Sequence, residues 1–272
     1  MKENIKRIVP PAAWEPVRQT YLAARRLPDL PAAYGHPWRR ESIRRLAALR
    51  DAHRGQRAFI IGNGPSLKNT DLSRLRNEYT FGLNRIYLMF PTLGFRTSCL
   101  VAVNDLVIEQ CRHEMDALPI PRFLSWRSRR FYEASPAVEN LPTFLYSTYD
   151  GPKFARDARG RLWEGATVTY VALQLAFHIG FSKVILVGVD HDFTSKGDAN
   201  RTVVSDGDDP NHFSPQYFGK GFRWQLPDLV TSELGYRMAR EAYARTGREV
   251  VDATVGGKLT VFPKVDYNSL FK

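Results

Sequence analysis

Cysteine and long apolar runs are scarce in this sequence of 272 residues. Its two cysteines, Cys99 and Cys111, lack CxxC spacing, which argues against a disulfide framework and a zinc site. No apolar run reaches the roughly 18 residues that a membrane-spanning helix needs. The basic residues 1–7 are not followed by an apolar segment, so they do not form a secretory signal. These absences predict a cytoplasmic protein.

Acidic residues are too few to balance the basic ones. Lys and Arg number 39 against 28 Asp and Glu, which gives a formal net charge of +11. Such an excess suits nucleic acid, an anionic membrane or phosphorylated small molecules. No block of Lys and Arg is interleaved with aromatic residues, so we expect no nucleic-acid partner. With 43% hydrophobic residues, the chain can bury one large core, or one domain plus an appendage.

Residues 1–55 differ in composition from the remainder. They are rich in Arg, Ala and Pro, which predicts short helical pieces interrupted by prolines. The strongest helical pattern covers residues 41–53, whose apolar side chains share one face. We therefore expect a basic helical N-terminal extension. It is either a packing extension with solvated arginines or an arm that contacts anionic lipid headgroups at the inner face of the membrane.

From residue 56 to residue 272, apolar β-branched runs alternate with helical patterns. The expected strands are residues 58–61, 79–83, 99–103, 144–147, 184–187 and 249–252, and the expected helices are residues 107–117, 167–179 and 227–246. Buried strands between helices predict a doubly wound, Rossmann-like parallel α/β sheet. A Ser-, Gly- and Asp-rich stretch followed by an aromatic one predicts a lid insertion at about residues 191–226. His178 lies in an apolar helical pattern and is expected to be a core residue.

The most informative segment is Ala58–Leu67, where four apolar residues lead into Gly62, Asn63 and Gly64. Glycine lets a ligand approach the backbone, and exposed N–H groups beyond such a turn favour an anion. The segment lacks both the Lys-Ser/Thr of a P-loop and the spacing of the dinucleotide fingerprint. It predicts a turn that faces a phosphate. The alternative is an ordinary strand-to-helix turn.

Amide and acidic side chains follow several of the expected strands. In a parallel sheet, ligands bind beyond the carboxyl ends of the strands, so these residues should converge on one crevice. They are Asn63, Asn84, Asn104, Asp105, Asp190 and Asp252. Gly188 stands two residues before Asp190 at the end of the same strand. Amide groups supply both donors and acceptors for a base, a ribose and phosphate oxygens. The pattern therefore predicts a nucleotide site.

In their order and spacing, these segments resemble a bacterial group of glycosyltransferases and their relatives. The group contains the family 42 sialyltransferases, the motility accessory factor glycosyltransferases, and proteins similar to 6-hydroxymethylpterin diphosphokinase (domain of unknown function 115). The resemblance covers roughly residues 56–265. It rests on Ile61–Leu67, Asp71–Leu75, Phe81–Tyr87, Ala166–Thr169 and Gly180–Asp190, together with a histidine in the lid.

The resemblance implies roles for particular residues. In the sialyltransferases, the matching positions hold the phosphate and ribose of a CMP-sugar and line its pocket. Those positions are Asn63, Ser66, Asn84, Asn104, Thr167 and Gly188 here. The lid histidine of that family is a general base, which implies that His212 takes the proton of an acceptor hydroxyl in an inverting transfer. An imidazole suits this role because its ordinary pKa, about 6.5, lies near working pH.

Two departures from the sialyltransferases concern the leaving phosphate. Where they have a tyrosine pair, this chain has His191 followed by Asp192 and Phe193, and Gly165 replaces an arginine. We expect other groups to neutralise the developing phosphate charge. The candidates are His191, Tyr217, Lys220 and Arg223.

Three functional hypotheses remain open. The first is an inverting glycosyltransferase without a tightly bound cofactor or metal. It transfers a sugar of the nonulosonic acid type from a CMP-sugar donor to an acceptor. The acceptor is a glycan, a lipid-linked molecule or a protein, in the modification of polysaccharide or flagellin. The second is a diphosphokinase-like transfer from ATP to a small alcohol, with Mg²⁺ held by Asp105, Asp190 and Asp192. The third is a nucleotide-binding scaffold without activity. A homo-oligomer is open under each of them.

Overall fold

The computed structural model describes residues 10–132, 142–149, 151, 153–194 and 197–272. They form two compact units, residues 1–41 and residues 42–272. The described part of the first unit is helical, and each helix in it has a proline in its first turn, where no backbone N–H is needed. Its elements are α2 (Pro11–Arg26), η1 (Leu27–Asp29), α3 (Leu30–Gly35) and the start of α4 (Pro37–Leu49). Across the described residues, no helix is long and apolar enough to cross a membrane.

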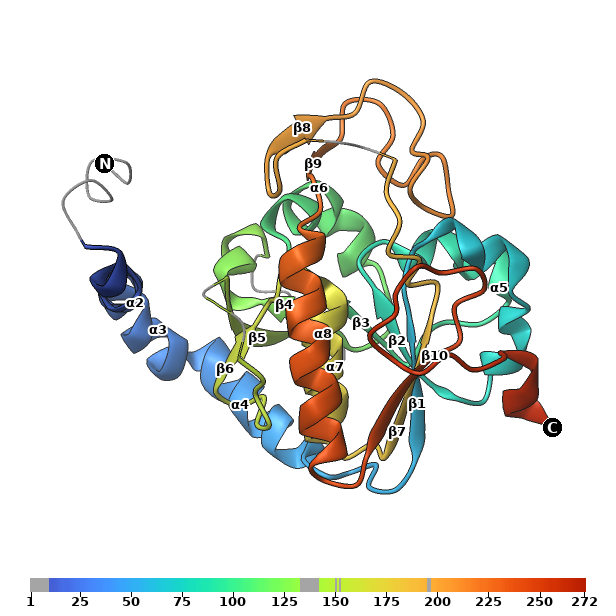
Figure 1. The fold of residues 1–272 in the computed structure, drawn as a ribbon, viewed down its shortest axis with the longest axis horizontal. Coiled ribbons are helices and arrows are strands. Elements are labelled where there is room, and N and C mark those ends of the chain that lie inside the picture. The colour runs from blue at the N-terminus through green and yellow to red at the C-terminus, as the bar shows by residue number, and fades with distance from the viewer. Residues whose placement is uncertain (1–9, 133–141, 150, 152, 195–196) are drawn as a thin grey trace. The chain divides into compact units, whose positions relative to one another are not determined.

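The second unit is built on an eight-stranded sheet whose neighbouring strands all run parallel (Figure 1). The strand order is β10-β7-β1-β2-β3-β4-β5-β6. The strands are β1 (Arg57–Ile61), β2 (Tyr79–Leu83), β3 (Cys99–Ala102), β4 (Arg122–Ser125), β5 (Thr143–Thr148), β6 (Arg161–Trp163), β7 (Lys183–Val187) and β10 (Glu249–Asp252). This confirms the doubly wound, Rossmann-like α/β fold. The chain runs outward from β1 to β6 and then returns to β7, so the direction switches between β1 and β7.

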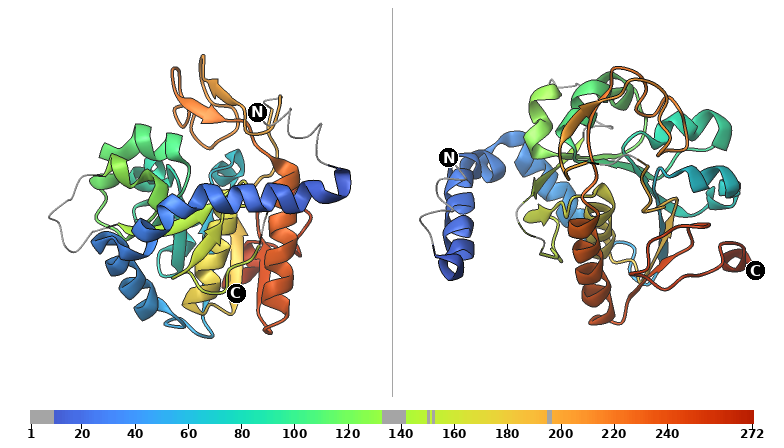
Figure 2. Two further views of the ribbon diagram at one scale, coloured as in Figure 1. Left: turned by 90° about the vertical axis from the view of Figure 1, so that its left-hand side faces the viewer. Right: turned by 45° about the horizontal axis from the view of Figure 1, so that its top comes forward.

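The helices cover both faces of the sheet (Figures 1 and 2). α7 (Val168–Ile179) and α8 (Leu229–Ala244) pack against each other on one face. Residues 169–179 of α7 are all buried, because this helix lies between the sheet and α8. On the other face lie α5 (Phe90–Leu93), α6 (Asp105–Asp116), η2 (Pro65–Asn69), η3 (Leu72–Leu75), η4 (Ile86–Met89) and η5 (Trp126–Phe131), as right-handed crossovers require. The chain ends in η7 (Asn268–Phe271).

Two strands of the sheet were not expected from the sequence. β4 contains only two apolar residues, Phe123 and Leu124, which follow the buried Arg122 in the sequence. Arg122 is buried because its guanidinium donates to the carbonyl of Asp116 at the end of α6, at 2.9 Å. β6 has three residues, too few for any hydrophobic period. Both strands pair only because tertiary contacts place them beside β3 and β5.

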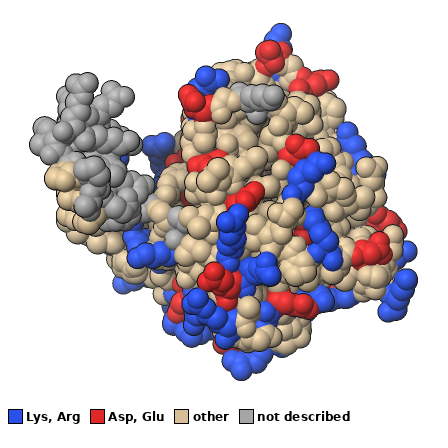
Figure 3. Space-filling view, in the orientation of Figure 1, with Lys and Arg blue, Asp and Glu red and all other residues tan. Residues whose placement is uncertain are grey.

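Charged side chains of both signs cover the second unit. On the face seen in Figure 3, Lys and Arg side chains are interspersed with Asp and Glu. Several form ion pairs on the surface, such as Arg237 with Glu233 at 3.0 Å and Arg245 with Glu241 at 3.1 Å. Exposed pairs of this kind contribute little to stability, about 0.2–1 kcal/mol each. On this face, the excess positive charge is dispersed and forms no continuous basic stripe.

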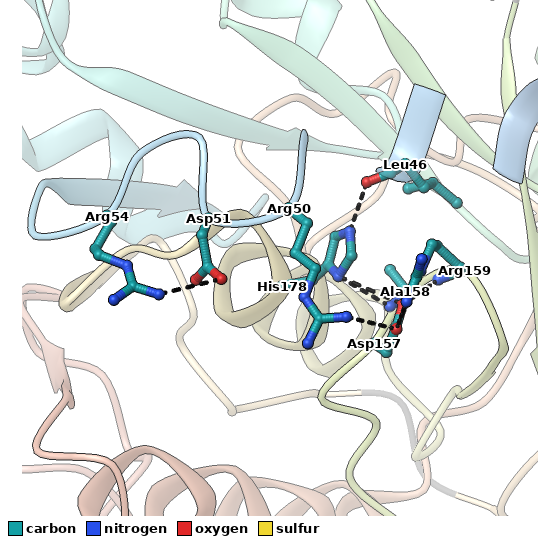
Figure 4. Close-up of polar contacts among 8 residues, drawn as sticks. All are labelled: Leu46, Arg50, Asp51, Arg54, Asp157, Ala158, Arg159 and His178. Carbon is teal, nitrogen blue, oxygen red and sulfur yellow. Dashed lines mark hydrogen bonds and ion pairs between the residues drawn. The ribbon is translucent and has the colours of Figure 1, made fainter. Parts of the chain in front are cut away.

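A buried histidine joins three segments at the end of α7 (Figure 4). His178 Nε2 lies 2.7 Å from the carbonyl oxygen of Leu46 in α4, and its Nδ1 accepts the backbone N–H of Ala158 at 3.3 Å. This pattern requires a neutral imidazole that carries its proton on Nε2. Burial lowers the pKa of His178 below its ordinary value, although Asp157 acts in the opposite direction. The expectation of a core histidine is confirmed.

His178 should make folding stability pH-dependent. Because its folded pKa is lowered, the unfolded chain binds a proton more readily, and stability is lost as pH falls below about 6.5. Hydrogen bonds from Arg159 lower the pKa of the neighbouring Asp157 to about 2, so that carboxylate stays ionised in this window. We expect His178→Gln to flatten the decline in unfolding free energy between pH 7 and 5, by at most about 1.4 kcal/mol per pH unit. Urea denaturation at several pH values measures this. Parallel slopes in the two proteins would contradict it.

Candidate functional site

A cavity lies at the carboxyl ends of the strands around the switch between β1 and β7. One wall comes from the segment 191–226, which includes the antiparallel pair β8 (Thr202–Val204) and β9 (Arg223–Gln225). Most of the residues predicted for the nucleotide site line this cavity. They are Gly62, Asn63, Gly64, Asn84, Asn104, Thr167, Gly188, Asp190, His191, His212 and Tyr217. Ser66, Lys220 and Arg223 are not among the lining residues.

The turn after β1 packs closely against the neighbouring β7 segment. The N–H groups of Gly62 and Gly64 donate to the carbonyl oxygens of Val187 and Gly188 in the neighbouring β7 segment, at 2.8 and 2.9 Å. A Cβ atom on Gly62 would lie 2.3 Å from the Gly188 oxygen. The glycines are therefore needed for close packing against β7. Their N–H groups are used within the fold, as is that of Ser66 beyond the turn, which donates to Asp190. That N–H groups beyond this turn bind an anion stays a prediction.

Ser66 is held by Asp190 at the same place. Its backbone N–H and its hydroxyl donate to the two carboxylate oxygens of Asp190, at 3.0 and 2.6 Å. Burial raises the pKa of Asp190, and these two hydrogen bonds act against that rise. Ser66 thus anchors the loop after β1 to the end of β7, and its own contacts position Asp190 rather than reach the cavity.

Asn63 and Asn84 present unsatisfied acceptors at the ends of β1 and β2. Asn63 Nδ2 donates to the carbonyl of Leu83 at 3.0 Å, which fixes the orientation of its amide. Its Oδ1 atom and that of Asn84 are buried and have no hydrogen-bond partner within the described residues. Buried polar atoms are usually paired, and both residues line the cavity, so these two oxygens are candidate acceptors for a ligand that donates hydrogen bonds. Ribose hydroxyls and the amino group of a base are such donors.

Asn104 and Thr167 begin the two helices whose first turns face the cavity. Asn104 Oδ1 accepts the N–H of Leu106 at 2.9 Å, and its Nδ2 donates to Gln225 in β9 at 3.0 Å. Thr167 Oγ1 accepts the N–H of Thr169 at 3.3 Å. Both side chains are thus helix caps, which the sequence reasoning did not foresee. The first turn of α7 has no acidic residue, so its N-terminus is the more favourable of the two for an anion.

His212 forms a dyad with Asp209. Its Nδ1 lies 2.6 Å from Asp209 Oδ2, so Nδ1 carries the proton and Nε2 is left as the acceptor. The Asp209 side chain is 3% exposed and the His212 side chain 13%, which hides the carboxylate but leaves the imidazole reachable. Backbone N–H groups of Asn211 and Phe218 also donate to Asp209, at 2.8 and 3.1 Å. The arrangement matches a general base oriented by a buried carboxylate.

The rest of the segment holds the dyad in place. The imidazole of His212 stacks on the ring of Tyr217, with centroids 4.0 Å apart and planes 11° apart. The guanidinium of Arg85, after β2, donates to the carbonyls of Gln216, at 3.2 Å, and of Tyr217. The N–H of Phe213 donates to the carbonyl of Asn63 at 2.9 Å. These bonds tie the dyad to the ends of β1 and β2.

Of the four candidates for phosphate stabilisation, two line the cavity and two do not. His191, at φ +55°, lines the cavity and lies 3.2 Å from Glu233. Tyr217 is fully buried, and burial raises the pKa of its phenol, so it supports His212 as a stacked ring. Lys220 is exposed, and Arg223 pairs with Glu109 at 3.0 Å on the surface. The structure brings neither Lys220 nor Arg223 to the cavity.

The three carboxylates considered for Mg²⁺ are separately engaged. Asp105 accepts the hydroxyl of Ser128 at 2.5 Å, while Asp190 is held by Ser66 and Asp192 is exposed. Among the described residues, no group of three His, Cys, Asp or Glu is arranged to hold a metal ion. The geometry thus gives the diphosphokinase hypothesis no magnesium site of the kind proposed for it.

Comparison with known proteins gives one structural likeness to report. No protein-family model and no curated protein matches the chain. The chain is similar to the solved structure of MAf glycosyltransferase from Magnetospirillum magneticum AMB-1, at 14% sequence identity and a TM-score of 0.45. The match covers 85% of this chain and 39% of that protein.

Proposed function

We propose that this protein is a glycosyltransferase that uses a nucleotide-activated sugar, with His212 as its general base. The observation that carries the proposal is the His212–Asp209 dyad, which faces a cavity at the switch point of a parallel sheet. A scaffold without activity has no need of an imidazole whose tautomer is fixed by a buried carboxylate. The cavity also offers the unpaired amide oxygens of Asn63 and Asn84 for a nucleoside.

The proposed reaction is a single displacement with inversion. His212 Nε2 accepts the proton of an acceptor hydroxyl as that oxygen attacks the anomeric carbon, and the bond to the donor phosphate breaks. Asp209 stabilises the imidazolium that forms. The N-terminus of α7, with Thr167 as its cap, lies where it can stabilise the departing phosphate. Within the described part of the lining there is no Lys or Arg, which favours a leaving group with less charge than a nucleoside diphosphate, such as CMP.

Thermal denaturation with CMP, CDP, UDP and ATP, each with and without Mg²⁺, tests the proposal. We expect CMP to raise the melting temperature without metal, because a ligand at 100 times its Kd stabilises the folded state by about 2.7 kcal/mol. Asn63→Ala should lose most of this shift, since the unpaired oxygen is removed. Stabilisation confined to ATP with Mg²⁺ would support the diphosphokinase hypothesis and overturn ours.

A further inference from the structure

The cavity continues along the edge of the sheet toward β5 and β6. Tyr149 follows β5 and Glu164 follows β6, and both line the same cavity as Asn63 at the end of β1. Four strand intervals separate β1 from β5 in the sheet, which is about 19 Å at ordinary strand spacing. The cavity therefore has a second end, away from the amides of Asn63 and Asn84.

Glu164 is a buried carboxylate in the wall of that second end. It is 2% exposed, and its Oε1 accepts hydrogen bonds from Arg127 at 2.8 Å and from Ser147 at 2.7 Å. Burial raises the pKa of Glu164, whereas Arg127 lowers it. Both of these hydrogen bonds use Oε1, and Tyr149 also interacts with the carboxylate, which lowers its pKa. A carboxylate has about four lone-pair sites, so Glu164 keeps acceptor capacity for a ligand hydroxyl or amine.

An aromatic ring lies beside this carboxylate. The guanidinium of Arg127 is 4.2 Å from the ring centroid of Tyr149, and Tyr149 is 50% exposed. Arg127 itself is not among the lining residues, and its charge is directed to Glu164 and, at 3.9 Å, to Asp105. A fixed ring face next to a carboxylate acceptor offers both contacts that a sugar ring needs, one for its apolar C–H face and one for its hydroxyls.

The charges around the cavity restrict which sugar it accepts. Among the lining residues that the structure describes, four are acidic, namely Glu164, Asp190, Asp192 and Asp228, and none is Lys or Arg. Like charges brought together at low dielectric are strongly unfavourable. A ligand carboxylate placed against Glu164 would be repelled, whereas a hydroxyl is accepted there and an amine is attracted. The phosphate of the proposed donor lies instead at the N-terminus of α7, where the helix dipole stabilises it. The buried, unpaired Oδ1 of Asn63 is an independent sign that the cavity is built for a ligand that donates hydrogen bonds.

We propose that Glu164 and Tyr149 form a sugar subsite that takes an uncharged or amine-bearing pyranose ring and rejects one that carries a carboxylate. This inference rests on the proposed function, because the sugar is assumed to be a substrate of the glycosyl transfer. A nonulosonic acid, the sugar type implied by the resemblance, carries the group that this lining disfavours. The ring belongs either to the donor or to the acceptor, and the experiment separates the two.

Ligand-observed NMR with glucose, glucosamine and glucuronic acid at millimolar concentration tests the subsite. The wild-type protein should bind glucose and glucosamine, and glucuronic acid about tenfold more weakly or less. Tyr149→Ala removes a half-exposed ring that is outside the main core, and it should weaken glucose binding about fivefold or more. Glu164→Gln should abolish the preference for glucosamine over glucose. The matched control, Glu249→Gln at the opposite, amino end of β10, should bind like the wild type.

Competition experiments identify which sugar occupies the subsite. If a CMP-sugar or UDP-sugar displaces bound glucose but CMP alone does not, the occupant is the donor sugar. If glucose stays bound in the presence of the nucleotide-sugars and of CMP, the occupant is the acceptor. Equal binding of glucuronic acid and glucose, no detectable binding of any of the three sugars, or wild-type affinity in Tyr149→Ala would overturn the subsite. Sugar binding without any stabilisation by nucleotides would refute the proposed function and leave the subsite standing.

Discussion

Replacement of His212 by alanine is expected to reduce turnover by about 10²–10⁴-fold and to leave nucleotide affinity nearly unchanged. The imidazole is the only group shown to be held as an acceptor by a buried carboxylate within the described part of the cavity. It stacks on Tyr217 and makes no hydrogen bond to Asn63 or Asn84 among the contacts of the described residues, so its loss should not disturb these amides. Steady-state kinetics with an identified donor, together with CMP titration, measure the two quantities. His113→Ala, which changes an exposed histidine on α6, is the control and should keep the wild-type rate.

Asp209→Asn separates the positioning role from a merely structural one. The amide still fills the space, but it no longer stabilises the imidazolium, so kcat should fall. The acidic limb of the pH–rate profile, where a general base is lost by protonation, should move to lower pH. A variant that keeps the wild-type rate and pH profile would show that Asp209 has no part in the reaction. A rate retained in His212→Ala would remove the proposed base.

Gly64→Ala is expected to lower the unfolding free energy by about 2–4 kcal/mol. A Cβ atom at this position would lie 1.8 Å from Asp190 Oδ2, and Asp190 cannot move aside without losing both of its hydrogen bonds to Ser66. Chemical denaturation measures the change. Gly207→Ala is the matched control, because a Cβ there meets no atom within 4 Å. Equal loss in the two variants would contradict the close packing between β1 and β7.

The sheet and its site were readable from the sequence to different degrees. Strands such as β1 and β7 are continuous apolar runs, and their periodicity alone predicts a buried parallel pair. The convergence of Asn63 and Asn84 followed from a topological rule, since neighbouring parallel strands end at the same edge. The interpretation of the turn after β1 was incomplete because glycine has two uses. A glycine can allow either a ligand or a neighbouring strand to approach the backbone closely. Here the Gly188 oxygen lies where a Cβ atom of Gly62 would be, which shows that the neighbouring strand approaches.

Other parts of the site needed tertiary information. Arg85 contacts the carbonyl of Gln216, which is 131 residues away, and no local pattern announces such a contact. Glu164 is a carboxylate after a three-residue strand, and its partner Arg127 lies in η5, far away in the sequence. Asp209 could have been found, because it stands three residues before His212, a spacing at which side chains of one turn meet. The Asp-rich composition of that loop concealed it.

The central claim is that the amide groups after β1 and β2 gather around one nucleoside beneath His212. A crystal structure of the protein with CMP tests this most directly. We expect donors of the ribose or the base to bond to Oδ1 of Asn63 and of Asn84, with the phosphate at the N-terminus of α7 and on the His212 side of the cavity. CMP bound at another surface, or bound here with both amide oxygens still unpaired, would contradict it.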